Sequence, residues 1–184
     1  DQFIAIKRTF ARNVYVLPNN KNIILAAQQA KTLVESDTDT RVHVIPTTSV
    51  TQGIAAMVAF APENGVEENT AAMAEAAGAV KSGAVTFAVR DTSINGFEIK
   101  QGNIMAMREG KIVACGDSVK ETAENLIESM TDEDSSYITI LYGDEVDRGE
   151  AEALLASVEE KYPMADVVLQ YGGQPLYYYF ISVE

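Results

Sequence analysis

Hydrophobic and polar positions at the start of the chain follow one another in a strand, helix and strand pattern. Residues 14–17 form a short apolar run that Pro18 ends, and residues 42–45 form a second run that Pro46 ends. Between these runs, apolar residues recur at helical spacing over residues 23–34. Because proline cannot continue a central strand, each run should close at a polar turn. The pattern predicts a βαβ unit.

The two turns that follow these strands are rich in polar side chains, including Asn19, Asn20, Thr47, Thr48 and Ser49. A right-handed crossover between parallel strands brings both following loops to one edge of the sheet, where open α/β folds bind ligands. The same residue types also cap helices and form turns. The sequence therefore predicts that the two turns lie side by side, and it leaves ligand binding and backbone geometry as two open interpretations of their side chains.

The period of the pattern changes to two between residues 84 and 115, after a helical stretch at residues 66–80. Turn residues separate the short alternating runs, with reversals expected at Asn95-Gly96, Gly102 and Gly110. This pattern predicts an antiparallel β-meander. A helix with an apolar stripe should follow it.

The last part of the chain, residues 137–184, repeats the opening order of strand, helix and strand and adds a terminal strand after a GGQP turn. A shift of 124 positions without a gap places Val14 on Ile138 and Val44 on Val168. The matching periods indicate two related βαβ units, through either internal duplication or shared architecture.

These patterns together predict an α/β fold, with two related βαβ units on a mainly parallel sheet and an inserted antiparallel β-meander. We expect residues 1–184 to form a single domain with sub-units at about residues 1–83 and 84–184. The hydrophobic content of 47% suffices for a core of its own. Because the chain starts at Asp1 rather than Met, we interpret it as a fragment, whose first residues are the amphipathic end of a helix.

Composition and charge narrow the classes of partner. With 27 acidic residues against 14 Lys and Arg, the net charge is −13, which disfavours binding to nucleic acid and to anionic membranes. We find neither a signal-peptide pattern nor an apolar run near the roughly 18 residues of a membrane span. Cys115 and His43 are the sole cysteine and histidine, so the chain can form neither an internal disulfide nor a Cys/His zinc cluster. We expect a soluble cytoplasmic protein.

Candidate chemistry is sparse. The sequence contains neither G-x-x-x-x-G-K-[ST] nor G-x-G-x-x-G, the two common phosphate-loop signatures. Its acidic clusters are more typical of solvated helix starts than of metal ligands. The pattern favours a surface or interlayer role for His43 and a small buried hydrophobic role for Cys115, which has no neighbouring histidine. The remaining candidates are polar turns at strand ends.

Two of these turns offer groups that could bind a partner. Gly172 and Gly173 could present exposed backbone amides to an anion or to another protein. Arg90, beside Asp91, could supply a positioned charge.

Four strings in the sequence identify a family. LPNNKNIILAAQQA, VIPTTSVTQGIAAM, TFAVRDTSINGFEIKQGN and GGQPLYYYFISVE occur in this order across nearly the whole chain. Together they resemble the C-terminal region of dihydroxyacetone kinase-like proteins, which include the large subunit of bacterial fatty acid kinase. The resemblance implies a DegV-like α/β fold. It also implies a larger kinase whose N-terminal domain binds ATP and magnesium and which serves phospholipid synthesis.

The resemblance further implies a non-catalytic role for this chain. The family's magnesium-holding aspartates and its middle Cys/His site have no counterpart here, so we assign no catalytic residue, metal or cofactor to the chain. The implied partners are a fatty-acid-carrying DegV-type protein and the rest of the kinase chain. The family also has an upstream strand and helix that end in another Gly-Gly-Gln turn, so a sheet edge should be exposed here, and a second copy could cover it in a homodimer.

We therefore expect the loops at the carboxyl edge of the sheet to dock the DegV-type protein. Arg90 is the sharpest candidate, since it could pair with a partner carboxylate or phosphate, or instead bridge to Asp91 or Asp117. Two alternatives are a phosphotransferase or hydrolase that uses the loops as a phosphate cradle, and a domain that itself holds an acyl chain. The expected docking residues are Asn19, Asn20, Thr47, Thr48, Gln52, Arg90, Asp91, Gly172, Gly173 and Gln174.

Overall fold

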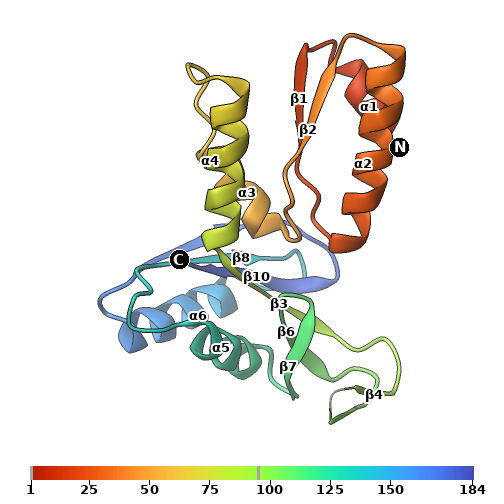
Figure 1. Cartoon of the computed structure of the whole chain (residues 1–184). Helices are drawn as coiled ribbons and strands as arrows, with labels where there is room; N and C mark the ends of the chain where they lie inside the picture. Colours follow the sequence, from red (N-terminus) through yellow and green to blue (C-terminus); the bar gives the residue numbers. More distant parts are fainter. Residues whose placement is uncertain (1, 95) are drawn as a thin grey trace. The chain divides into compact units, whose positions relative to one another are not determined.

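The computed structural model describes residues 2–94 and 96–184, which form two compact units (Figure 1). The first unit ends at Val80, and the second runs from Lys81 to Glu184. The division falls three residues before the expected boundary at residue 83. Each unit has its own strands and its own core.

The first unit contains the predicted βαβ unit. Its two strands pair in parallel, with Val14 opposite Val42 and Val16 opposite Val44. Asn20 caps the connecting helix, because its Oδ1 accepts a hydrogen bond from the Asn22 amide at 2.8 Å. The elements of this unit are α1 (Gln2–Arg8), β1 (Asn13–Val16), α2 (Lys21–Asp37), β2 (Arg41–Val44), α3 (Val50–Val58) and α4 (Val66–Ala79).

Alternate side chains of β1 and β2 enter two different cores. Val14, Val16 and Val44 pack with buried residues of α1 and α2, which include Ile6 and Val34. On the other face of the sheet, the side chain between Val14 and Val16 and the side chains just after β1 and β2 pack against α3 and α4. That second cluster contains Tyr15, Leu17, Ile45, Ala56, Met73 and Ala77. The small sheet is therefore covered by helices on both faces.

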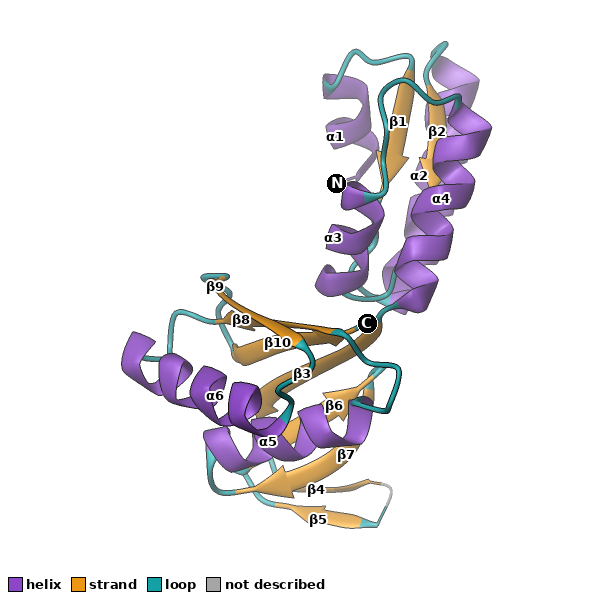
Figure 2. Ribbon diagram, turned by 90° about the vertical axis from the view of Figure 1, so that its left-hand side faces the viewer, coloured by secondary structure: helices purple, strands orange, loops and turns teal. Residues whose placement is uncertain are grey.

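The second unit holds a six-stranded sheet in the order β7-β6-β3-β10-β8-β9 and a separate β4-β5 hairpin (Figure 2). Its elements are β3 (Lys81–Phe87), β4 (Thr92–Ile94), β5 (Phe97–Ile99), β6 (Ile104–Arg108), β7 (Lys111–Gly116), α5 (Val119–Met130), β8 (Tyr137–Tyr142), α6 (Arg148–Lys161), β9 (Asp166–Tyr171) and β10 (Tyr177–Val183).

The β-meander is confirmed: β3, β6 and β7 are antiparallel neighbours. Glu109 and Gly110, both with positive φ (50° and 78°), form the two-residue turn that joins β6 to β7. Gly102, with φ 89°, lies at the preceding reversal. Asn95 lies outside the residues that the structure describes, so the turn predicted at Asn95-Gly96 does too.

The α/β class and the two βαβ units are also confirmed, since β8 and β9 pair in parallel with α6 between them. The expectation of one mainly parallel sheet needs correction. The two βαβ units lie in separate sheets. In the six-stranded sheet, four of the five strand pairs are antiparallel. A helical crossover fixes the direction of its own two strands only. The short turn after Tyr171 reverses the chain, so β10 must run antiparallel to β8.

The gapless repeat also needs a small correction. Asn13 pairs with Arg41, whereas Tyr137, the equivalent of Asn13, pairs with Asp166. The second βαβ unit thus has one additional residue between its strands.

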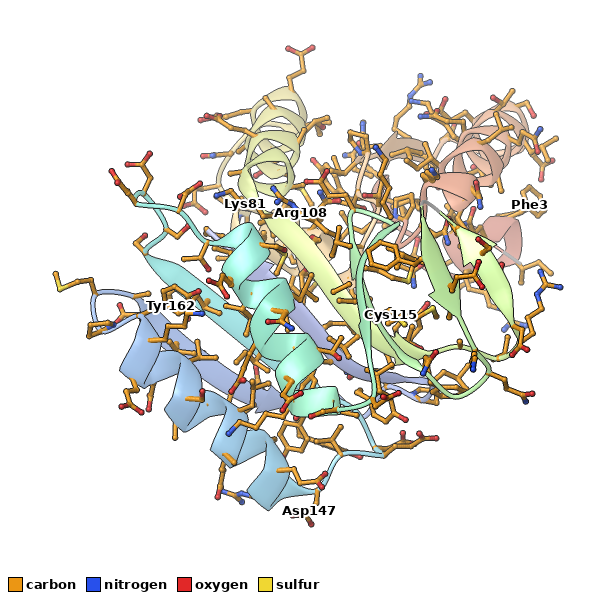
Figure 3. The ribbon with its side chains drawn as sticks, turned by 90° about the horizontal axis from the view of Figure 1, so that it is seen from below. Phe3, Lys81, Arg108, Cys115, Asp147 and Tyr162 are labelled. Atoms are coloured by element: carbon orange, nitrogen blue, oxygen red, sulfur yellow. The ribbon has the colours of Figure 1, made fainter. Side chains whose placement is uncertain are left out.

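Helices α5 and α6 cover one face of the six-stranded sheet and form its core with Leu126, Ile127 and Leu154 (Figure 2). The end of α5 is held to the meander by polar contacts of Arg108 and Lys81, both labelled in Figure 3. Arg108 donates from Nη1 to the Ser129 carbonyl at 2.5 Å, and Lys81 pairs with Asp132. The helix layer therefore fixes the meander strands and the second βαβ unit as one body.

Candidate functional site

The two polar turns of the first unit lie side by side, as predicted. Buried Thr47 donates from Oγ1 to the Pro18 carbonyl at 2.6 Å, which ties the loop after β2 to the loop after β1. Gln52 Oε1 accepts from both the amide and the hydroxyl of Thr48, at 2.8 and 2.9 Å. Together with the Asn20 cap, these bonds show that several of the polar side chains build the loops themselves, while Asn19 is exposed.

Three loops of the second unit meet at one edge of its sheet. β3 and β8 both run antiparallel to β10, so their carboxyl ends and the start of β10 lie at the same edge. β9, parallel to β8, ends there too. Thr86, near the end of β3, donates from Oγ1 to the Leu176 carbonyl at 2.6 Å. This bond confirms that the end of β3 lies close to the start of β10. Arg90 and Asp91 thus share an edge with Gly172, Gly173 and Gln174.

The Gly-Gly-Gln turn is tightly joined to the end of β8. The amides of Gly172 and Gly173 both donate to the Tyr142 carbonyl, at 2.9 and 3.4 Å. The Gln174 side chain donates from Nε2 to the Leu141 carbonyl at 3.0 Å, and the Gln174 carbonyl accepts from the Asp144 amide at 3.2 Å. The prediction of exposed Gly172 and Gly173 amides is therefore wrong, because the β8–β9 ladder continues into the turn and uses both.

Arg90 is an exposed positive charge at this edge. Its neighbour Asp91 accepts from the Gln101 amide at 2.7 Å, and Asp117 accepts from Asn103 Nδ2 at 2.9 Å. Among the described residues, no ion pair involves Arg90. The alternative in which Arg90 bridges to Asp91 or Asp117 is thus not realised here, and its guanidinium faces solvent with its donors available.

The expected docking residues divide evenly between the two units. Asn19, Asn20, Thr47, Thr48 and Gln52 belong to the first, and Arg90, Asp91, Gly172, Gly173 and Gln174 to the second. The two sets would share one edge only if β1 and β2 belonged to the six-stranded sheet, and these strands form a sheet of their own. Docking through either set stays a prediction.

His43 and Cys115 each contact residues of a neighbouring strand. His43 Nε2 lies 3.1 Å from Asn13 Oδ1, and its ring centroid lies 5.1 Å from that of Tyr15. Burial is the main cause that lowers the pKa of His43, and the charge of Lys31 lowers it further. The charge of Glu35 opposes this shift. Cys115 is half-buried in β7 opposite Met105 (Figure 3).

Acidic residues likewise serve local structure, as Asp147 does when it caps α6 by accepting from the Gly149 amide at 2.7 Å. Residues 2–94 and 96–184 contain no group of three or more His, Cys, Asp or Glu that could hold a metal ion. None of the helices in these ranges has both the length and the apolar character needed to cross a bilayer.

The whole chain, residues 1–184, matches the family model for the C-terminal part of FakA-like fatty acid kinase proteins. The chain belongs to this family. Relatives of the FakA-like chain include the Staphylococcus haemolyticus protein SH1689, 45% identical over 97% of the chain, and Bacillus subtilis protein YloV, 44% identical over 98%. The chain spans only 32% of the length of each relative.

Solved structures share the fold of this FakA-like chain at low sequence identity. The Streptococcus pneumoniae fatty acid kinase (Fak) B3 protein, loaded with linoleic acid, has a TM-score of 0.68 and 14% identity, over 100% of this chain and 74% of that protein. A fatty acid-binding DegV family protein from Thermus thermophilus gives the same TM-score and identity, over 99% of this chain and 75% of that protein. The predicted DegV-like fold is therefore confirmed.

Proposed function

We propose that this chain docks a fatty-acid-carrying DegV-type protein as the non-catalytic C-terminal part of a fatty acid kinase large subunit. In this proposal, the rest of the parent protein binds ATP and magnesium and phosphorylates the carboxylate of the carried fatty acid. The observation that carries the proposal is the match of all 184 residues to the C-terminal family of FakA-like fatty acid kinase proteins.

The likeness to the Fak B3 protein supports a docking role. Two chains with one fold can associate about an approximate two-fold axis, in which equivalent surfaces of both chains meet. A kinase chain and a carrier protein of the same fold could therefore form a pseudo-symmetric pair, as two copies of a single protein do in a dimer. The TM-score of 0.68 extends over the entire chain, so such equivalent surfaces could come from any of its elements.

Charge supports the edge that carries Arg90. The chain has a net charge of −13, and Arg90 is an exposed guanidinium that has no ion pair among the described residues. A guanidinium binds carboxylate or phosphate through two parallel hydrogen bonds. Either group could come from the partner or from the carboxylate that receives the phosphoryl group.

The phosphate-cradle alternative gains little from the loop geometry. A cradle needs free amides and hydroxyls that point at one anion. The amides of Gly172 and Gly173 donate to Tyr142, and Thr47 donates to Pro18. These donors stabilise the loops, which is consistent with a docking surface of fixed shape.

A competition experiment tests the proposal. Excess 184-residue chain, added to the full-length kinase, its fatty-acid-loaded DegV-type partner and ATP, should slow formation of acyl phosphate because it occupies the partner. Additional partner should restore the rate, since the chain does not act on ATP. An unchanged rate with the chain at tenfold excess over the partner would contradict docking.

A further inference from the structure

We propose that two copies of this chain associate through the free edge of β9, so that their β9 strands pair antiparallel across a two-fold axis. In the described part of the chain, β9 ends the six-stranded sheet and has β8 as its one strand neighbour. This edge belongs to the second unit, so it is distinct from the edge of β1 in the first. The proposal concerns self-association and is independent of the docking proposed above.

Backbone groups of β9 point alternately toward β8 and away from it. At the start of β9, the Asp166 amide donates to the Ser136 carbonyl at 2.9 Å. In a parallel ladder, alternate residues face opposite neighbours. The N–H and C=O groups of Val167, Leu169 and Tyr171 therefore face away from β8, and no strand in the described ranges pairs with them.

The two edges of the six-stranded sheet differ in how open they are to a further strand. β7, at the far end of the sheet, is bulged at Val113, which has no cross-strand partner in β6. A bulge bends an edge strand and interrupts its pairing with another chain. β9 instead pairs with β8 over six residues without a register shift, and Asp166 is its one charged residue. β9 is thus a straight and nearly uncharged edge.

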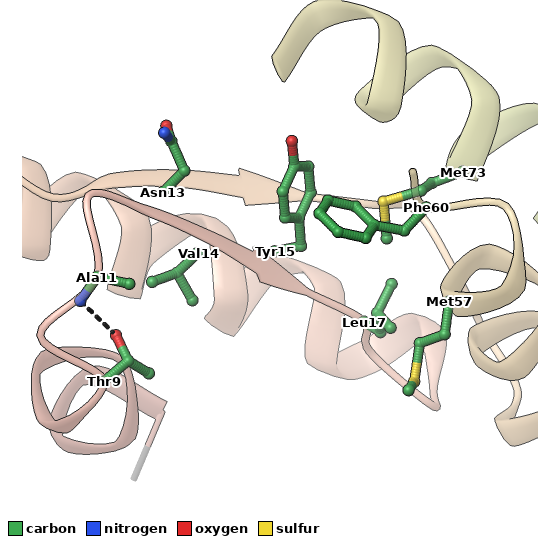
Figure 4. Close-up of a pocket in the computed structure, with 9 residues that line it drawn as sticks. All are labelled: Thr9, Ala11, Asn13, Val14, Tyr15, Leu17, Met57, Phe60 and Met73. Carbon is green, nitrogen blue, oxygen red and sulfur yellow. Dashed lines mark hydrogen bonds between the residues drawn. The ribbon is translucent and has the colours of Figure 1, made fainter. Parts of the chain in front are cut away.

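The strands of the first unit present less favourable edges. β1 and β2 are each four residues long. The Val42 amide of β2 is already used, because it donates to Glu35 Oε1 at 2.9 Å. A hollow of about 430 Å³ lies beside Tyr15 of β1, with Met57 and Phe60 among its lining residues (Figure 4). An edge that is short, covered or recessed is a poor template for a second copy.

The outward groups of β9 fit a second copy in the register centred on Leu169. When Leu169 lies opposite Leu169 of the second copy, Val167 of each copy lies opposite Tyr171 of the other. In an antiparallel pair, facing residues exchange two hydrogen bonds at alternate positions. Every outward N–H and C=O group of these residues would therefore find a partner. The strand is self-complementary, as a two-fold interface requires.

Charge and apolar surface agree with this register. Asp166 would lie opposite Gly172 of the second copy, so no like charges meet within the strand pair, although each copy has a net charge of −13. Exposed apolar side chains stand at the two ends of β9, with Met164 92% and Tyr171 60% exposed. Antiparallel pairing brings Met164 of each copy to the same end as Tyr171 of the other. Association would therefore remove apolar surface from water at both ends.

Val168 and Gln170 offer positions at which the register can be tested. Val167 and Leu169 pack on the core that α5 and α6 cover, so Val168 and Gln170 lie on the opposite face of the sheet. In the proposed register, Val168 of each copy faces Gln170 of the other. Opposite charges at facing positions stabilise a strand pair, and like charges destabilise it.

Amide hydrogen exchange of the 184-residue chain tests the edge. From low to high micromolar concentration, exchange of the Val167, Leu169 and Tyr171 amides should slow by about tenfold relative to the amides of Val168 and Gln170, which face β8 at all concentrations. A ratio that does not change with concentration would overturn the proposal.

Sedimentation equilibrium of two double variants tests the register. Val168→Lys with Gln170→Lys sets like charges at facing positions and should raise the Kd of the dimer by about tenfold. Val168→Glu with Gln170→Lys sets opposite charges there and should lower it. Equal Kd values for the two variants would overturn the proposal. So would a chain that stays monomeric while the two lysines weaken its binding to the DegV-type protein, because the edge would then belong to that partner.

Discussion

Replacement of Gly143 by alanine should lower the melting temperature of the second unit by about 10 °C or more, which corresponds to a loss of about 3 kcal/mol in its free energy of unfolding. A Cβ at this position would lie 2.2 Å from the Tyr177 carbonyl oxygen and 2.6 Å from the Gln174 carbonyl oxygen. Both obstacles are backbone atoms, so no side-chain rotation relieves the overlap. The segment that enters β10 would have to move.

That movement would break bonds at the loop edge. The Gly143 amide donates to the Tyr178 carbonyl at 2.9 Å, and the Asp144 amide donates to the Gln174 carbonyl at 3.2 Å. The chain has no tryptophan, so far-UV circular dichroism during heating is the suitable measurement.

Gly78→Ala is the matched control for Gly143→Ala. A Cβ on Gly78 would have no heavy atom within 4 Å, and the residue lies in α4, so alanine there should be neutral or stabilise the helix by up to about 1 kcal/mol. Equal melting temperatures for Gly143→Ala and the unsubstituted protein would show that the loop after β8 is not held as described.

Replacement of Arg90 by alanine should weaken docking of the DegV-type protein by about 1 to 3 kcal/mol, or roughly 5- to 150-fold in Kd. The melting temperature should stay nearly unchanged, because Arg90 is exposed and has no ion pair within the described ranges. The expected loss is that of a charge-assisted hydrogen bond to a carboxylate or phosphate. Titration calorimetry with the loaded partner measures it.

Two further variants separate geometry from charge. Arg90→Lys keeps the positive charge but loses the planar pair of donors, so it should bind with intermediate affinity. Lys111→Ala removes an exposed positive charge at the start of β7, which lies at the other end of the strands from Arg90. This variant should bind as the unsubstituted chain does. Normal binding by Arg90→Ala together with a lower melting temperature would remove this edge as the docking site.

Local sequence features predicted the elements well because their causes are local. Pro18 and Pro46 end apolar runs, and Asn20, Ser49 and Ser118 each cap the helix that follows them. Each of these effects involves atoms within a few residues, so the sequence pattern contains it.

Strand neighbours were harder to predict because they depend on contacts between distant segments. β10 lies between β3 and β8, although β3 precedes it by about half the chain. A period of two indicates which side chains face a core, but it does not indicate which strand lies alongside. For the same reason, the inward orientation of the Gly172 and Gly173 amides and the hollow beside Tyr15 had no signal in the sequence pattern.

Direct titration of the 184-residue chain with its cognate fatty-acid-loaded DegV-type protein, without ATP, tests the central claim that this part of the kinase docks the carrier. The proposal predicts saturable association at a ratio of one to one, which Arg90→Ala weakens and Lys111→Ala leaves unchanged. No detectable association at high micromolar concentrations of both folded proteins would contradict it.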